Sequence, residues 1–237
     1  MRLFYDPEIK IGVHELRQEE AHHCAKVLRL SVGSVISVTD GRGFLFRCQI
    51  IEVGQKKTIL QVLEPEEGLG KRNYSLHVAL CPTKSIDRTE WFIEKSTEIG
   101  IDEITPLISQ NSERKLVKYE RLNRVAEAAM KQSHKSYHPK INEQISFDKF
   151  INQKFDYYHK FIAHCEDDLN KKYLGHLLEK NKSVIVLIGP EGDFTPDEIK
   201  TAKQTGFIPV SLGNSRLRTE TAGIVACDIC SVINQFE

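Results

Sequence analysis

Apolar and polar residues alternate in short runs through the first part of the chain, which is typical of strands with one buried face. The strands predicted in this way are Val32–Thr39, Phe44–Val53 and Thr58–Leu63. Asp40–Gly43 supplies the aspartate and glycines of a hairpin turn between the first two strands. A short helix over Gln18–Leu28 precedes them. Short strands at this close spacing predict a compact β-barrel.

From Tyr74 onward the pattern changes to strands that alternate with helices. The predicted strands are Tyr74–Cys81, Ile101–Ile108, Phe161–Cys165, Val184–Ile188 and Phe207–Leu212. The predicted helices are Asp87–Ile99, Tyr119–Gln132 and Leu169–Glu179, with two more that begin at Pro196 and Thr219. This order favours an α/β fold with a mostly parallel sheet and helices on both faces. Residues 133–160 show no readable pattern.

Glu64–Gly70 is the clearest linker, because it holds two glycines, a proline and three acidic residues in seven positions. We therefore predict two domains, residues 1–70 and residues 71–237. The sequence contains no internal repeat or low-complexity tract.

The strand Val184–Ile188 leads directly into a loop and a well-marked helix start. Thr195 can cap that helix, Pro196 suits its first position, and Glu198 completes a capping box. Within the loop, Gly189 and Gly192 can take backbone angles closed to other residues and leave room for a ligand to lie against the main chain.

The segment after Phe207 repeats this plan. Gly213–Leu217 is a predicted loop, and the helix from Thr219 carries Glu220 in its first turn. We expect the two loops to lie at the carboxyl ends of neighbouring parallel strands, where open α/β sheets bind ligands. The alternative is that both are ordinary strand-to-helix turns.

Composition and charge narrow the function only slightly. The 237 residues are 40% hydrophobic, which is ordinary for a soluble globular protein, and 33 basic residues balance 33 acidic ones. The net charge therefore gives no argument for nucleic acid, and such a partner would need a local basic patch. Charged residues near Met1 exclude a signal peptide and no run approaches a membrane span, so a cytoplasmic location is expected.

The six cysteines are scattered and predicted to be reduced thiols. Cys227 and Cys230 have the spacing of a metal or redox pair, but no second pair lies nearby, which favours a structural role. His22 and His23 are similarly expected to be surface or core residues, because no further ligands follow at metal spacing. We predict no metal site.

Two segments together resemble one known family. Residues 189–198 read GPEGDFTPDE and residues 212–222 read LGNSRLRTETA, which resembles the RsmE family of the SPOUT superfamily, methyltransferases that act on N3 of a uridine in 16S ribosomal RNA. The resemblance implies an N-terminal PUA-like β-barrel that binds RNA and a C-terminal α/β SPOUT domain with a deep trefoil knot. It also implies S-adenosyl-L-methionine as cofactor, a homodimer, and 16S rRNA or the assembled small ribosomal subunit as partner.

The resemblance also assigns residues to two binding roles. The cofactor would contact Ile188, Gly189, Pro190, Glu191, Gly192, Leu212, Gly213, Leu217 and Arg218. By position rather than by matching residues, His164 and Cys165 would form a third cofactor loop. The RNA would contact His22, Arg29, Lys84, Arg88, Arg114, Gln132 and Lys135. A solvated surface of mixed charge is the alternative for this basic set, since glutamates are interspersed with it.

Methyl transfer to a uracil nitrogen needs alignment, proton removal and donors for the developing negative charge. Arg218 is the candidate for stabilising that charge, and Glu220 either orients Arg218 or complements the helix dipole. Many relatives carry arginine at the position of Ser215 and an aliphatic residue at that of Arg216. Arg216 either replaces the missing charge or faces solvent.

Two other functions remain open on the sequence. One is a SPOUT methyltransferase for another RNA, such as transfer RNA, and the other is a non-enzymatic RNA-binding assembly factor. A Rossmann-type enzyme is disfavoured, because no early G-x-G-x-x-G follows a first strand.

Overall fold

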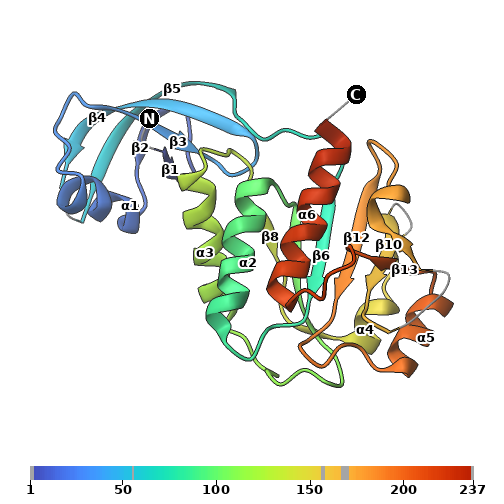
Figure 1. Cartoon of the computed structure of the whole chain (residues 1–237). Coiled ribbons are helices and arrows are strands. Elements are labelled where there is room, and N and C mark those ends of the chain that lie inside the picture. The colour runs from blue at the N-terminus through green and yellow to red at the C-terminus, as the bar shows by residue number, and fades with distance from the viewer. Residues whose placement is uncertain (1–2, 55, 156–157, 167–170, 236–237) are drawn as a thin grey trace. The chain divides into compact units, whose positions relative to one another are not determined.

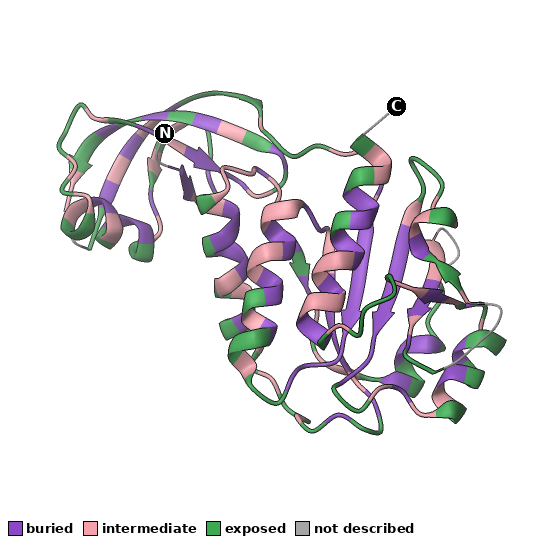
Figure 2. Cartoon of the chain, in the orientation of Figure 1, coloured by how far each residue is buried: buried purple, intermediate pink, exposed green. Residues whose placement is uncertain are grey.

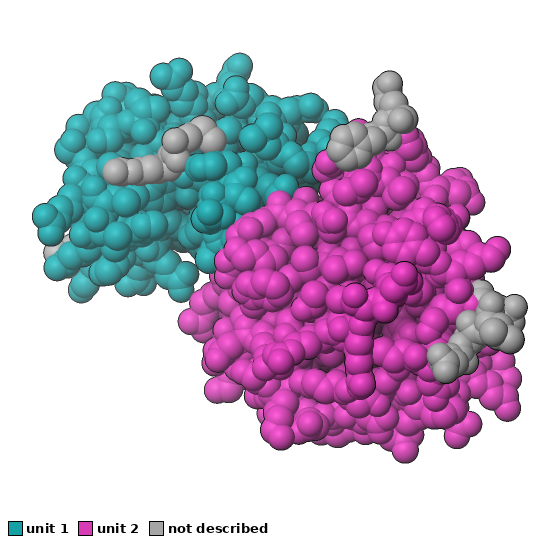
Figure 3. Space-filling view, viewed as in Figure 1, with its two compact units in different colours: residues 1–71, 127–138 teal, residues 72–126, 139–237 magenta. Residues whose placement is uncertain are grey.

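The computed structural model describes residues 3–54, 56–155, 158–166 and 171–235. The chain divides into two compact units (Figure 3). Unit 1 comprises residues 1–71 and 127–138, and unit 2 comprises residues 72–126 and 139–237. Each unit is built around a β-sheet of its own.

Unit 1 is the small β-rich part that the alternating pattern predicted. Its strands are β1 (Leu3–Tyr5), β2 (Gly12–Glu15), β3 (Val35–Thr39), β4 (Phe44–Val53) and β5 (Thr58–Glu67). They form one sheet in the order β1-β3-β4-β5-β2, in which only the β1–β3 pairing is parallel. The predicted short helix is present as α1 (Gln18–His22) followed by a π-helical turn, η1 (His23–Val27). The apolar faces of strands and helix meet around buried Phe4, Cys24 and Ile50.

Strand β5 runs four residues further than predicted, so the linker prediction is wrong over residues 64–67. Pro65 lies opposite Phe46 of β4. The pairing of β2 with β5 ends at Val62. Beyond Val62, the edge of β5 that faces away from β4 has no partner strand among the described residues, so a proline, which lacks an N–H, is tolerated there.

Residues 127–138 join unit 1, although they are distant from it in sequence. This segment includes the last part of α3 (Tyr119–Gln132). Lys131 Nζ contacts Glu20 Oε1 at 2.5 Å, and Glu127 forms an ion pair with Arg17. The sequence predicted a single crossing between domains near residue 70 and did not indicate this second one.

Unit 2 contains an eight-stranded sheet, with seven strands on its main path and one beside it, and every pairing in it is parallel. The order is β11-β13-β10-β12-β6-β7-β8, with β9 paired to β7. The strands are β6 (Leu76–Leu80), β7 (Glu103–Ile108), β8 (Lys140–Ile141), β9 (Ile145–Ser146), β10 (Tyr158–Ala163), β11 (Lys172–Tyr173), β12 (Ser183–Ile188) and β13 (Ile208–Ser211). The remaining helices are α2 (Ile86–Ile99), α4 (Phe147–Ile151), α5 (Pro196–Gln204) and α6 (Thr219–Gln235), with a 3₁₀ turn η2 (Leu174–His176).

Helices cover both faces of this sheet, which confirms the predicted layering (Figure 1). On β12, Val184, Val186 and Ile188 face a core shared with α2, α3 and α6. Ile185 and Leu187 of the same strand face a second core shared with α4 and α5. A strand buried on both faces reads as a continuous apolar run, as this one does, and the central strands are buried in Figure 2.

The structure differs from the sequence prediction in two regions, residues 169–179 and residues 133–160. Of the helix predicted over Leu169–Glu179, residues 169 and 170 lie outside the described part of the chain, and the rest contains β11 and η2 but no α-helix. Pairing of β11 with β13 at the sheet edge overrides the local helical preference. Residues 133–160 contain β8, β9 and α4, which are too short to leave a periodic pattern. Within the described residues, no helix is long and apolar enough to cross a membrane.

Candidate functional site

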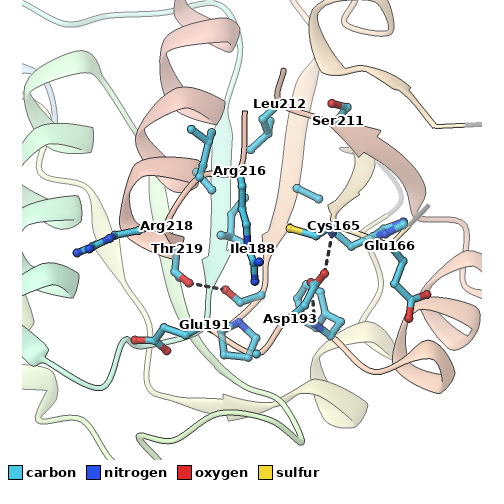
Figure 4. A pocket seen from close by; sticks show the side chains of 18 of the residues that line it. Cys165, Glu166, Ile188, Glu191, Asp193, Ser211, Leu212, Arg216, Arg218 and Thr219 are labelled. Carbon is cyan, nitrogen blue, oxygen red and sulfur yellow. Dashed lines mark hydrogen bonds between the residues drawn. The ribbon is translucent and has the colours of Figure 1, made fainter. Parts of the chain in front are cut away.

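A cavity of about 1160 Å³ opens in unit 2, where the loops after β10, β12 and β13 come together (Figure 4). Both strand-to-helix loops expected from the sequence line it. The strands β12 and β13 are not neighbours, however, because β10 lies between them and pairs with both. The expectation that the two strands are neighbours is therefore wrong. The expectation that their loops meet at the carboxyl ends of the strands is confirmed.

The loop after β12 begins on a buried strand and ends on the predicted capping box. Thr195 Oγ1 accepts a hydrogen bond from the Glu198 N–H at 3.2 Å, and the Glu198 side chain accepts from the Thr195 N–H at 2.9 Å. Both bonds satisfy amides that the first turn of α5 would otherwise leave unpaired. The far end of the loop is therefore fixed by local sequence.

Asp193, rather than a glycine, carries the unusual backbone angle of this loop. Its φ is +61°, whereas Gly189 and Gly192 are not among the residues with positive φ and so do not use the backbone freedom that glycine allows. Aspartate tolerates this region better than most residues do. Gly189 is instead closely packed, since an added Cβ would lie 3.1 Å from Asp193 Oδ1 and 3.1 Å from the Phe194 ring, and these neighbours would have to shift to admit it.

The carboxylate of Asp193 joins two of the three loops. Its Oδ2 accepts a hydrogen bond from the backbone N–H of Cys165 at 2.6 Å, and its Oδ1 accepts from the Phe194 N–H at 2.8 Å (Figure 4). Lys171 Nζ donates to the carbonyl oxygens of His164 and Glu166 on the same third loop, at 2.9 and 2.7 Å. His164 and Cys165 thus line the cavity in the place expected for them.

Two further loops hold the first one from outside. Asn111 Nδ2 donates to the carbonyl oxygens of Gly192 and Asp193, at 3.3 and 3.1 Å. Glu191 Oε1 accepts the backbone N–H of Lys84 at 2.9 Å. Sequence reasoning missed the roles of Asp193 and Asn111. An acidic residue directly after Gly192 was a usable signal for Asp193, but nothing in the local pattern singled out Asn111.

The loop after β13 has its own internal bonds. Ser211 Oγ accepts from the Gly213 N–H and donates to the Gly213 carbonyl oxygen, at 3.1 and 2.9 Å. Gly213 has φ +132°, which side chains rarely allow. At the end of the loop, buried Thr219 donates its hydroxyl to the Gly189 carbonyl at 3.1 Å. The first and second loops are therefore bonded directly to each other (Figure 4).

Glu220 does not orient Arg218 as one alternative expected. Its carboxylate is buried, and the cation near it is Arg88, whose Nε lies 3.8 Å from Glu220 Oε1. Glu220 also stands in the first turn of α6, in agreement with the helix-dipole alternative. Arg218 is exposed, and in Figure 4 its side chain points away from Asp193 and Cys165.

The predicted RNA-binding residues divide between the units. His22, Arg29, Gln132 and Lys135 lie in unit 1, where the first three are exposed and Lys135 is partly buried. Lys84, Arg88 and Arg114 lie in unit 2.

Two of the basic residues in unit 2 form a small structured group. Arg114 donates to the carbonyl oxygens of Thr83 and Lys84, at 3.0 and 2.6 Å. The ammonium of Lys84 pairs with Glu113 at 2.8 Å, and this hydrogen bond raises the pKa of Lys84. Glu113 therefore partly compensates the charge of Lys84. The group lies beside the cavity, because the backbone N–H of Lys84 is bonded to Glu191, which lines it.

The cysteines behave as buried thiols with one exception. All six are unpaired, and Cys165 alone among them is exposed. Burial raises the pKa of Cys230 to about 12 and raises that of Cys227 as well, so both remain neutral thiols in α6. In the part of the chain that the structure describes, no group of histidine, cysteine or acidic residues is arranged to hold a metal ion.

The chemistry of the cavity suits a ligand that is part apolar and part polar. Ile188, Leu212 and Leu217 supply apolar walls, while Gly189–Gly192 and Gly213 present backbone groups. The volume is slightly above the usual range for a site that binds one small ligand.

Comparison with known proteins agrees with this geometry. Residues 70–231 match the family model described as "RNA methyltransferase domain", and residues 16–63 match "RNA methyltransferase PUA domain". The chain is 30% identical over 216 residues to ribosomal RNA small subunit methyltransferase E of Synechocystis sp., which covers 89% of this chain and 70% of the relative.

Two solved structures are similar over nearly their whole length. A probable rRNA-methyltransferase of Porphyromonas gingivalis is 39% identical with a TM-score of 0.92, covering 99% of this chain and 98% of that one. Ribosomal RNA small subunit methyltransferase E of Neisseria gonorrhoeae, solved bound to S-adenosyl methionine, is 24% identical with a TM-score of 0.89 and the same coverage. At that identity the second likeness supports the fold.

Proposed function

The chain belongs to the RNA methyltransferase family, in its ribosomal RNA small subunit methyltransferase E (RsmE) group, and on that premise we propose that it methylates N3 of a uridine in 16S rRNA with S-adenosyl-L-methionine. The observation that carries the proposal is the cavity built from three loops, because their mutual hydrogen bonds form a preorganised ligand site. All nine residues assigned to the cofactor line this cavity.

The residues present fit the cofactor. Ile188, Leu212 and Leu217 offer apolar walls to the adenine, and Gly189–Gly192 and Gly213 leave backbone groups within reach of its polar edge. When bound, S-adenosyl-L-methionine supplies an electrophilic methyl group on its sulfonium. The loops serve to hold that methyl group in line with the attacking nitrogen.

Arg218 is the residue that we assign to the substrate base. Its guanidinium forms no hydrogen bond or ion pair with any residue that the structure describes, and it lies exposed at the edge of the cavity. A permanently charged planar donor there would stabilise negative charge on a uracil carbonyl oxygen as N3 loses its proton. Glu220 acts through Arg88, which lines the same cavity.

The RNA would be held by basic residues from both units. Lys84, Arg88 and Arg114 supply phosphate contacts beside the cavity, and His22, Arg29, Gln132 and Lys135 supply contacts from the PUA-like unit. We further propose that residues 1–70 and 71–237 act as the RNA-gripping and catalytic domains. The trefoil knot stays a prediction from the family resemblance.

We also propose that the protein works as a homodimer in the cytoplasm. Trp91 on α2 and Val232 on α6 remain 44% and 42% exposed, although these two helices pack against each other. A second subunit that covers apolar residues here would help complete each site. Light scattering on the eluted protein would give a dimer mass, and a monomer mass at micromolar concentration would refute this part.

The function itself is tested in two stages. Calorimetric titration with S-adenosyl-L-methionine should show saturable binding, which Gly213→Val should abolish because valine cannot adopt φ +132°. Transfer of a labelled methyl group to small ribosomal subunits from a strain without this enzyme, followed by nucleoside analysis, should then yield 3-methyluridine. Methylation confined to transfer RNA would instead support another RNA target. Absence of cofactor binding, even with rRNA present, would support a non-enzymatic assembly factor.

A further inference from the structure

Arg216 is a cavity residue whose role the proposed reaction does not explain. It is exposed, and its guanidinium makes no hydrogen bond or ion pair with any residue in the described ranges. In Figure 4 its side chain extends from the second loop toward the first, on the side of Asp193 and Thr219. A permanent charge that lines a cavity in this way is placed to meet an anion.

The other cations that line the cavity are engaged or directed elsewhere. Lys171 Nζ is held by two carbonyl oxygens of the third loop. Arg88 lies 3.8 Å from the buried carboxylate of Glu220. Arg218 points away from the first and third loops in Figure 4. Arg216 therefore supplies the positive charge available to a ligand seated between the loops.

Two of the acidic side chains that line the cavity accept hydrogen bonds from the backbone. Asp193 accepts two N–H groups and Glu191 accepts one, and among the described residues none of the cavity's acidic side chains, Asp193, Glu191 or Glu166, forms an ion pair with Arg216. The anion must therefore come with a ligand. S-adenosyl-L-methionine has a single anionic group, the carboxylate of its methionine portion, while its sulfonium and ammonium groups are positive.

We propose that Arg216 binds the methionine carboxylate of the cofactor and thereby positions it in the cavity. The planar guanidinium can donate two parallel hydrogen bonds to the two carboxylate oxygens. The inference rests on the proposed function, because it takes the cofactor as given. The inward course of the side chain favours the cofactor over an RNA phosphate, which would approach from outside.

A ligand that lacks only this carboxylate isolates the proposed contact with Arg216. Decarboxylated S-adenosylmethionine keeps the adenosine, sulfonium and amine, so its affinity should not depend on Arg216. Calorimetric titrations of the wild type, Arg216→Gln and Arg216→Lys with both ligands form a cycle that isolates the contact. Lys200→Gln, an exposed lysine on α5, is the matched control for loss of a positive charge.

The wild type should bind S-adenosyl-L-methionine on the order of tenfold more tightly than the decarboxylated ligand. Arg216→Gln should remove that preference by weakening the first ligand alone, and Arg216→Lys should keep part of it, because lysine retains the charge without the planar pair of donors. Lys200→Gln should leave the preference unchanged. Added salt should also reduce the wild-type preference, because the contact is open to solvent.

Equal weakening of both ligands by Arg216→Gln would overturn the proposal, since it would indicate a packing role. Unchanged cofactor binding together with weaker, less salt-dependent binding of rRNA would overturn it in favour of a phosphate contact. Failure of the wild type to bind S-adenosyl-L-methionine with rRNA present is a different outcome, because it would refute the proposed function and this inference together.

Discussion

Asp193→Ala is the substitution that most directly tests how the three loops form one site. The change removes a carboxylate that accepts the Cys165 and Phe194 N–H groups, at 2.6 and 2.8 Å. It also leaves an alanine at φ +61°, where aspartate is better tolerated. The Cys165 bond is the important one, because it joins the first loop to the third.

The cost can be assembled from its parts. Hydrogen bonds to a charged acceptor contribute about 1.5 kcal/mol or more each, and at this partly exposed site we take about 1 kcal/mol for each. The left-handed backbone adds about 1 kcal/mol for alanine. The formed arrangement of the loops should therefore lose about 3 kcal/mol relative to open arrangements. The dissociation constant of the cofactor should then rise at least tenfold and at most about 150-fold.

Calorimetric titration with S-adenosyl-L-methionine measures this rise. Thermal unfolding should shift little, because the loss is confined to a surface loop rather than the core. Asp193→Asn is the matched control, since asparagine tolerates the same backbone angle and keeps one carbonyl acceptor, and its effect should be several times smaller. A folded Asp193→Ala protein whose affinity is within twofold of the wild type would refute the view that this carboxylate organises the site.

Three further predictions concern stability, pH and turnover. Thr195→Ala should lower the free energy of unfolding by about 1 kcal/mol through loss of the capping box, as measured in urea, whereas the control Thr201→Ala on the exposed face of α5 should cost less. Burial lowers the pKa of His77 to about 4, so the unfolded chain takes up this proton before the folded one as pH falls. The His77 contribution should therefore reduce stability between about pH 6.5 and 4, by up to about 3 kcal/mol, and a His77→Asn protein with the same pH slope would contradict this. Arg218→Ala should lower the turnover number at least about 100-fold while changing cofactor affinity less than about threefold, and loss of cofactor binding alone would show that its role is misassigned.

Local features of the fold were predictable where one stretch of chain supplies both partners of an interaction. The capping box at Thr195 and Glu198 is an example, because the two residues lie three positions apart and bond within a single turn. Helix α2 ends at Gly100, where φ is +124°, for a similar reason. The apolar run over Val184–Ile188 likewise predicted the strand β12.

Predictions failed where the partner of a residue is distant in sequence. Of the two alternatives for Glu220, the pair with Arg218 considered only a residue two positions away, whereas the cation near its carboxylate is Arg88 on α2. Gly189 and Gly192 were singled out as the residues free to take an unusual backbone angle, but that angle falls on Asp193, whose carboxylate reaches a loop 28 residues earlier in the chain. Periodicity reports which face of an element is buried and says nothing of what is packed against it.

The sequence alone was enough to predict the family, the fold class and the positions of the two loops. Motifs, helix caps and apolar periodicity are local properties of the chain, so they can be recognised without the structure. The order of the strands, with β10 between β12 and β13, and the assignment of residues 127–138 to unit 1 came only from the folded structure. So did the hydrogen bonds by which Asp193 and Thr219 join three loops into one cavity. Contacts across long separations depend on how all the elements pack together, and no short stretch of sequence carries that information.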